Sequence, residues 1–119
     1  MQFKFNSVVF SSIRISELRA FYEGKLGFPT GTYQKNGETI PDFSESYVNY
    51  HVGGGLVGFE QEQGENAAAG NGDIILNVSD FDRFREKVKA AGIPIIKENS
   101  FFFAIKDPEG RTLIFEPST

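Results

Sequence analysis

The sequence predicts an α+β fold of two tandem βαβββ modules, whose curled mixed sheets form around a cleft. Each half contains a helix-like stretch that stops at a glycine, Gly27 or Gly92, with a proline two residues later. Each half then closes with an apolar strand whose last residue is a carboxylate, Glu60 or Glu116. Features that recur in the same order within one short chain indicate paired structural modules.

The length of 119 residues is that of one domain. We expect module one at about 1–61, a linker at about 62–72 and module two at about 73–119. The linker assignment rests on residues 62–71, which contain Gly, Asn and Ala but no large apolar residue. The whole chain is therefore expected to be a single domain made of two similar halves.

Composition excludes several classes of function. The net charge of −4 and the absence of Lys or Arg runs argue against a nucleic-acid partner. No apolar run reaches the length that spans a membrane, and the N-terminus lacks the apolar region of a signal peptide. The absence of cysteine excludes disulfides, thiolate metal sites and cysteine nucleophiles. We expect a cytoplasmic protein with a small-molecule ligand.

The first module is predicted from its apolar spacing. A strand at 3–11 precedes a helix that begins near Ser16 and ends at Gly27. A polar stretch from Tyr33 holds a short edge strand, and strands at 46–52 and 56–61 flank a triple-glycine hairpin turn. The helix has one apolar stripe at offsets of three and four, formed by Leu18, Phe21, Tyr22 and Leu26.

The second module repeats this order. A strand at 73–78 leads to a helix at 81–91 that Ser79 or Asp80 caps. Strands follow at 93–97, 101–106 and 112–116, and a Pro- and Gly-containing turn at 107–110 joins the last two. The apolar stripe of this helix consists of Phe81, Phe84, Val88 and Ala91.

Alternation along the strands assigns side chains to the two faces of each sheet. Phe59 and Phe115 are expected to face the helix, so their neighbours Glu60 and Glu116 face the concave side. The same alternation turns Val8, Phe10, Ile74, Leu76 and Val78 toward the helices. It turns Ser7, Val9, Asp73, Ile75 and Asn77 toward the cleft.

With these elements in this order, the chain resembles the vicinal oxygen chelate superfamily, which includes glyoxalase I, extradiol dioxygenases and the fosfomycin- and bleomycin-resistance proteins. The resemblance covers essentially the whole chain. It rests on these motifs: Phe21-Tyr22-Glu23, Leu26-Gly27-Phe28, Ala91-Gly92-Ile93, and the run from Phe103 through Asp107-Pro108-Glu109-Gly110-Arg111 to Leu113-Ile114-Phe115-Glu116. The fold it implies is the one predicted above, and small members of this superfamily often complete their clefts as homodimers.

The resemblance also implies where a metal would be held. Catalytic members use a residue on the first strand of each module, often histidine, and a carboxylate on the last strand of each. Glu60 and Glu116 match the last-strand positions, whereas Ser7 and Asp73 occupy the first-strand positions. The only histidine, His51, lies elsewhere. An iron dioxygenase, which needs two histidines and a carboxylate, is therefore not expected.

Two interpretations of the carboxylates remain open. Glu60, Asp73 and Glu116 can form an oxygen-rich site for a divalent ion such as Mg²⁺, Mn²⁺, Zn²⁺ or Ni²⁺, with Glu116 as the catalytic group that moves a proton. Alternatively the glutamates end their strands in solvent and no metal is bound. The first interpretation predicts a metal-assisted lyase or isomerase, and the second a protein that binds a small organic ligand.

Thirteen phenylalanines predict an aromatic-lined cleft or an aromatic core. In the Phe101-Phe102-Phe103 run only alternate side chains can face the cleft, and parity favours Phe101 and Phe103, although core packing accounts for them equally well. His51 is either a base or a surface residue beside a turn. The expected ligand-binding residues are Ser7, Val9, Asn49, His51, Asn77, Phe101 and Phe103.

Overall fold

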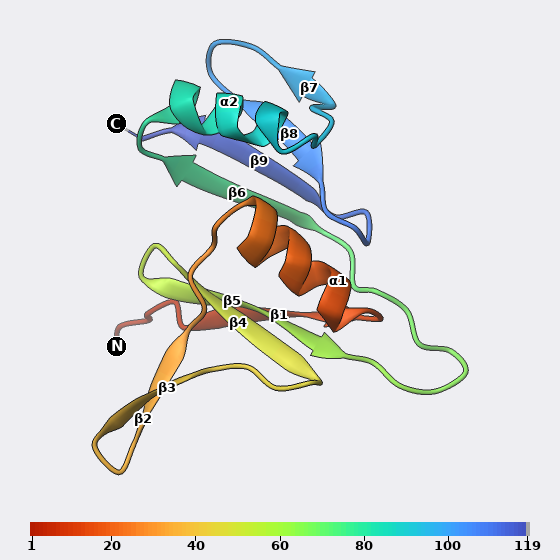
Figure 1. Ribbon diagram of the computed structural model, residues 1–119. Coiled ribbons are helices and arrows are strands. Elements are labelled where there is room, and N and C mark those ends of the chain that lie inside the picture. Colours follow the sequence, from red (N-terminus) through yellow and green to blue (C-terminus); the bar gives the residue numbers. More distant parts are fainter. Residues whose placement is uncertain (119) are drawn as a thin grey trace. The chain divides into compact units, whose positions relative to one another are not determined.

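The computed structural model describes residues 1–118 and divides into two compact units, Met1–Gly70 and Asn71–Thr119. The division lies within the predicted linker. The chain has the mixed α+β architecture that the sequence predicts, with strands in both units and a helical segment in each (Figure 1). None of the helices within residues 1–118 has the length and apolar character needed to cross a bilayer.

The sheet of the first unit has three strands in the order β1-β5-β4. β1 (Ser7–Ser12) runs parallel to β5 (Gly55–Gln61), which runs antiparallel to β4 (Tyr47–Val52). The predicted strand at 3–11 begins late, at Ser7. Just before it, the Asn6 carbonyl accepts a hydrogen bond from the Leu56 amide at 2.9 Å.

The predicted edge strand near Tyr33 is instead a hairpin. β2 (Thr32–Lys35) and β3 (Glu38–Pro41) pair with each other in a separate two-stranded sheet and extend away from the main sheet of this unit (Figure 1). Their turn has positive φ at both central residues, 51° at Asn36 and 80° at Gly37. Asparagine followed by glycine favours this conformation, which matches the twist of the strands.

The helical segment of the first unit begins as α1 (Ile15–Arg19) and continues as a π-helix, η1 (Ala20–Lys25). The Leu26 amide bonds to the Phe21 carbonyl, five residues back, at 3.0 Å. The segment ends at Gly27, whose φ of 75° is the left-handed conformation that glycine adopts without strain. The predicted apolar stripe is confirmed, because Leu18, Phe21, Tyr22 and Leu26 are all buried.

The second unit has a four-stranded sheet in the order β6-β9-β8-β7, packed against α2 (Phe81–Ala90). β6 (Asp73–Val78) is parallel to β9 (Thr112–Pro117), and β8 (Phe103–Lys106) is antiparallel to both β9 and β7 (Lys97–Glu98). The parallel–antiparallel pattern of β1-β5-β4 therefore recurs in β6-β9-β8. This recurrence explains the sequence repeat.

Two strand predictions in the second unit extend too far. The predicted strand at 93–97 is a loop until Lys97, and within it Pro94 has no amide to give to a ladder. The predicted strand at 101–106 begins only at Phe103. The Asn99 side-chain oxygen accepts hydrogen bonds from the amides of Phe101 and Phe102, at 2.7 and 3.1 Å, which removes both donors from strand pairing.

The start of α2 also differs in detail from its prediction. Asp80 occupies the N-cap position, but its backbone is left-handed (φ 52°, ψ 49°) and its side chain makes no capping hydrogen bond. By contrast, the predicted turn at 107–110 is confirmed, and one carboxylate closes it. The Asp107 carboxylate accepts bonds from the amides of Glu109 and Arg111 and from the buried Arg111 guanidinium.

Aromatic rings form the core of both units. In the first, the Tyr22 ring contacts those of Tyr50 and Phe59, with centroids 5.4 and 5.0 Å away. In the second, Phe115 contacts Phe84 and Phe103 at 4.9 and 5.1 Å. Each helical segment therefore covers one face of its sheet, which leaves the opposite face of each sheet to be considered as a site.

Candidate functional site

The open face of the first sheet carries side chains from three strands at matching register. Glu60 and Leu56 on β5 point to the same face, because they lie four residues apart on one strand. The neighbours of β5 on β1 and β4 are fixed by strand pairing. Across the sheet, this face consists of three rows: Ser7–Leu56–His51, Val9–Gly58–Asn49 and Ser11–Glu60–Tyr47.

Five of the predicted site residues therefore lie on one face. Ser7, Val9, Asn49, His51 and Glu60 come from three different strands and share this surface. Val9 is 53% exposed, and Ser7, His51 and Glu60 are exposed as well. The strand assignments and the alternation of faces made from the sequence were sufficient to find this group.

A glycine at the centre of this face makes room for an amide. A Cβ atom at Gly58 would lie 2.2 Å from Asn49 Oδ1 and 3.4 Å from Val9 Cγ2, so the Asn49 side chain lies directly over the central strand. Asn49 Nδ2 donates to Asp42 Oδ2 at 2.7 Å, and the Asn49 backbone N–H donates to the Asp42 backbone carbonyl at 3.2 Å. These bonds fix the side chain, with its oxygen over Gly58 and beside an exposed valine.

Hydroxyl and carboxylate groups surround this amide. Burial of the Tyr47 ring, the negative charge of Asp42 and a hydrogen bond to that carboxylate raise the pKa of the Tyr47 phenol. Tyr47 therefore stays neutral at physiological pH and keeps its donor. Tyr47 is paired across the sheet with Glu60, so a carboxylate and a phenol are neighbours at one end of the face. This end can bind an N–H or ammonium group.

The open face of the second sheet is more apolar. The register places Asp73 beside Thr112, Ile75 beside Ile114, and Asn77 beside Glu116. Ile75 is 59% exposed, whereas its neighbour Ile74 is 7% exposed and faces the core, as alternation predicts. On the far side of β9, the Lys106 ammonium donates to Thr112 Oγ1 at 2.6 Å.

The strand register tests the predicted metal ligands within each unit. Asp73 is level with Thr112, four positions from Glu116, which is about 13 Å along the strands. This separation exceeds the combined reach of the two side chains to one ion. Ser7 is likewise four positions from Glu60 and has a still shorter side chain. Within residues 1–118, neither unit groups three His, Asp or Glu side chains closely enough to hold an ion. The residues of each unit do not fit the metal that the family resemblance implies.

One predicted ligand-binding residue lies on the wrong face. Phe103 is paired directly with Phe115, so both rings point toward α2. Phe103 is completely buried, with its ring also near those of Phe81 and Phe84. The parity argument from the sequence was wrong for Phe103, because the pairing of Lys106 with Thr112 across the turn places Phe103 opposite Phe115, on the helix side of the sheet. Phe101 lies in the loop before β8 and is 74% exposed.

Two residues at the first face were not predicted from the sequence as site residues. Asp42 lies just after the unexpected β3, so no pattern placed it beside Asn49. Tyr47 was assigned to a strand but not to a site. Gly58 offered a usable signal, since a glycine inside a strand often marks the close approach of another group.

The comparisons with known proteins agree with this architecture. The model of the Glyoxalase/Bleomycin resistance protein/Dioxygenase superfamily matches residues 4–115. Comparison with curated proteins gives no match. Lactoylglutathione lyase from Agrobacterium tumefaciens superposes with a TM-score of 0.71 at 14% identity, covering 97% of this chain and 93% of that one.

Two further solved structures are similar over almost their whole length. A virulence protein from Salmonella typhimurium gives a TM-score of 0.74 at 18% identity, with 100% of this chain and 99% of that chain covered. The bleomycin-binding protein from Streptomyces verticillus, complexed with copper(II)-bleomycin, gives 0.64 at 17% identity with the same coverage. At these identities the structures show a shared fold, and the family model shows membership. The chain belongs to the Glyoxalase/Bleomycin resistance protein/Dioxygenase superfamily.

Proposed function

We propose that this protein binds a small organic molecule on the open face of its first unit, without a metal ion. The observation that carries the proposal is the central row of that face, Val9–Gly58–Asn49. It combines an exposed apolar side chain with an amide that Asp42 orients and that Gly58 allows to lie over the central strand. Apolar contact and a few oriented polar groups are usual elements of a small-molecule site.

The charges around this row favour a cationic or neutral ligand. Glu60 ends the face on β5, and Asp42 lies behind Asn49. The strands β1, β4 and β5 contain no Lys or Arg. An ammonium group gains attraction from both carboxylates and from the Tyr47 ring, whereas a phosphate is repelled. We therefore propose that amines and neutral aromatic compounds bind here in preference to phosphorylated ones.

A metal-dependent lyase or isomerase is the second candidate. It is favoured by one observation, the equivalent positions of Glu60 and Glu116 on the central strands of the two sheets. In that case Glu116 acts as the base that moves a proton. The first-strand partners of these glutamates weigh against it, because a serine and an aspartate four register positions away replace the longer imidazoles that the family uses.

The remaining expectations belong to the same proposal. We propose that the protein acts in the cytoplasm, consistent with its lack of cysteine, and as a homodimer, as small members of the family often do. Ser7 and His51 are proposed as further ligand contacts because each is exposed on this face. Asn77 and Phe101 are exposed on the second unit and are proposed as ligand contacts of that unit only. Phe103 is excluded from this set.

An NMR titration of isotopically labelled protein tests the proposal. Benzylamine, benzyl alcohol and phenyl phosphate share one ring and differ in charge. We expect the amine and the alcohol to shift the amide signals of β1, β4 and β5, and the phosphate to leave them unchanged. Asn49→Ala should weaken these shifts, and Ile75→Ser on the other sheet serves as the matched control. If phenyl phosphate gives the strongest shifts on these strands, the proposed ligand class is wrong.

A further inference from the structure

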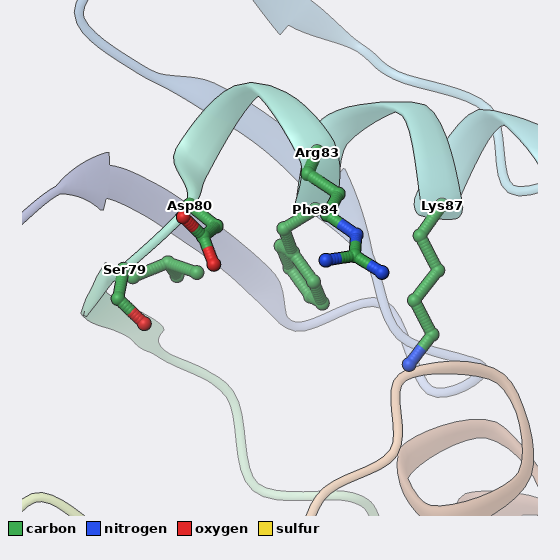
Figure 2. A pocket seen from close by; sticks show the side chains of 6 residues that line it. Ser79, Asp80, Arg83, Phe84 and Lys87 are labelled. Atoms are coloured by element: carbon green, nitrogen blue, oxygen red, sulfur yellow. The ribbon is translucent and has the colours of Figure 1, made fainter.

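A hollow on the surface of the second unit lies beside the start of α2. Six residues from the end of β6 and the first two turns of α2 line it, and its volume is about 500 Å³. That volume is within the range of small-molecule sites. Figure 2 shows the labelled lining side chains Ser79, Asp80, Arg83, Phe84 and Lys87.

Two cations of this hollow differ from the other cations of the same helix. Arg85 pairs with Asp82 and Glu98 at 3.5 and 3.3 Å, and Lys89 pairs with Glu98 at 3.6 Å. Arg83 and Lys87 are exposed and form no ion pair within the part of the chain that the structure describes. They stand one turn apart, an arrangement of like charges that destabilises a helix. No ion pair of the described residues therefore uses the charge of either side chain.

The two cationic side chains lie on the same side of the Phe84 ring. In Figure 2 the Arg83 guanidinium extends toward the Lys87 side rather than toward Asp80, and the Phe84 ring lies between Asp80 and the two cations. Phe84 packs inward on Phe115, and its ring is only partly buried. A flat apolar group can cover the exposed part of this ring while an attached anion reaches the two cations.

We propose that this hollow binds a small organic carboxylate that carries a flat apolar ring. The carboxylate accepts charge-assisted hydrogen bonds from the Arg83 guanidinium and the Lys87 ammonium. The ring of the ligand packs on Phe84 and Val78. This site shares no residue with the proposed site on the first sheet, and it has the opposite charge preference.

The test uses benzoate and its neutral analogue benzamide as probes, with labelled protein at low salt. Millimolar benzoate is expected to shift the amide signals of residues 78–87 in a saturable manner, and benzamide to shift them far less. The double variant Arg83→Gln/Lys87→Gln should raise the Kd for benzoate roughly 25-fold, because the loss of each exposed cation weakens binding about fivefold and the two factors multiply. Lys89→Gln removes the same kind of charge from the same helix and should leave the affinity unchanged.

Three results would overturn the proposal: no saturable shift in this region, equal binding of benzamide, or undiminished binding by the double variant. Arg83→Lys keeps a cation in place and should retain most of the affinity. This variant distinguishes a loss of charge from a disturbance of the helix. The titration reports each amide signal separately. A negative result for residues 78–87 would therefore leave the result for β1, β4 and β5, which tests the proposed function, unaffected.

Discussion

The two units share a strand topology and a register but present different surfaces at equivalent positions. Glu60 and Glu116 occupy the same place on the central strands, so the residues around them can be compared one by one. Four positions earlier, the first unit has Ser7–Leu56–His51 and the second Asp73–Thr112–Lys106. In the central row, the first unit has Val9–Gly58–Asn49 and the second Ile75–Ile114–Ala104.

The central row shows most clearly how the units have diverged. In the first, a large polar side chain on the outer strand lies over a glycine on the central strand. In the second, the outer strand has alanine and the central strand isoleucine. One arrangement gives an oriented amide, and the other an apolar surface. The charges diverge as well, since the first unit has five Lys and Arg against eight Asp and Glu, and the second seven against eight.

The largest expected effect separates core from surface within one aromatic run. Phe103→Ala removes a fully buried ring and should lower the free energy of unfolding by about 3–5 kcal/mol. Phe101→Ala, two residues earlier, removes an exposed ring and should change it by less than about 0.5 kcal/mol. Urea denaturation of both variants measures the difference. Equal effects would show that the assignment of faces in the second sheet is wrong.

The next prediction concerns the glycine that distinguishes the central rows. Gly58→Ala places a Cβ atom where Asn49 Oδ1 lies, so the amide must move and its bond to Asp42 is strained. We expect a loss of about 1–3 kcal/mol. Gly24→Ala is the control, because a Cβ there meets nothing within 4 Å and alanine favours a helix. A stable Gly58→Ala protein with unchanged ligand binding would remove the central row from the proposed site.

A smaller effect tests the partly exposed polar anchor that Arg19, Glu23 and Tyr50 form in the first unit. The Arg19 guanidinium donates twice to the Glu23 carboxylate, at 2.7 and 3.1 Å, and the buried Tyr50 hydroxyl donates to it at 2.8 Å. The bond from Arg19 is the main cause that lowers the pKa of Glu23 below its ordinary value of 4.5. Glu23 is partly exposed, so we expect Glu23→Gln to cost only about 1 kcal/mol at neutral pH.

The sign of the pH dependence follows from the direction of that pKa shift. A carboxyl group with a lowered pKa in the folded state stabilises the protein fully above its ordinary pKa. That stabilisation is lost as the pH falls through the lowered value. The wild-type protein should therefore lose more stability than Glu23→Gln between pH 5 and the acid range, and their melting temperatures should converge. If the difference between the two melting temperatures stays constant across this pH range, the proposed stabilising role of Glu23 is wrong.

The sequence predicted the repeated elements well because each has a strong periodic signal. The strand at 73–78, the stripe on both helical segments and the glycine at each helix end were all identified. The failures occurred where a local side chain controls the backbone. Asn99 binds two amides and delays β8. The direction of Phe103 was wrong for another reason, since the register across the last turn places it opposite Phe115.

For the candidate site, face alternation was sufficient to group Ser7, Val9, Asn49, His51 and Glu60. It does not give position along the strands. The prediction of a shared site for Asp73 and Glu116 treated two residues on one face as neighbours, although the register separates them by four positions. Contacts from irregular segments, such as Asp42 to Asn49, have no periodic signal and could not be predicted.

The central proposal is that neither Glu60 nor Glu116 is a ligand of a metal ion. The most direct measurement is the melting temperature with and without Mn²⁺ or Ni²⁺, for the wild-type protein and for Glu60→Gln and Glu116→Gln. A metal that binds the native state alone raises the melting temperature. We predict no metal-dependent rise in any of the three proteins. A rise in the wild-type protein that Glu116→Gln abolishes would contradict the account and establish the metal-dependent alternative.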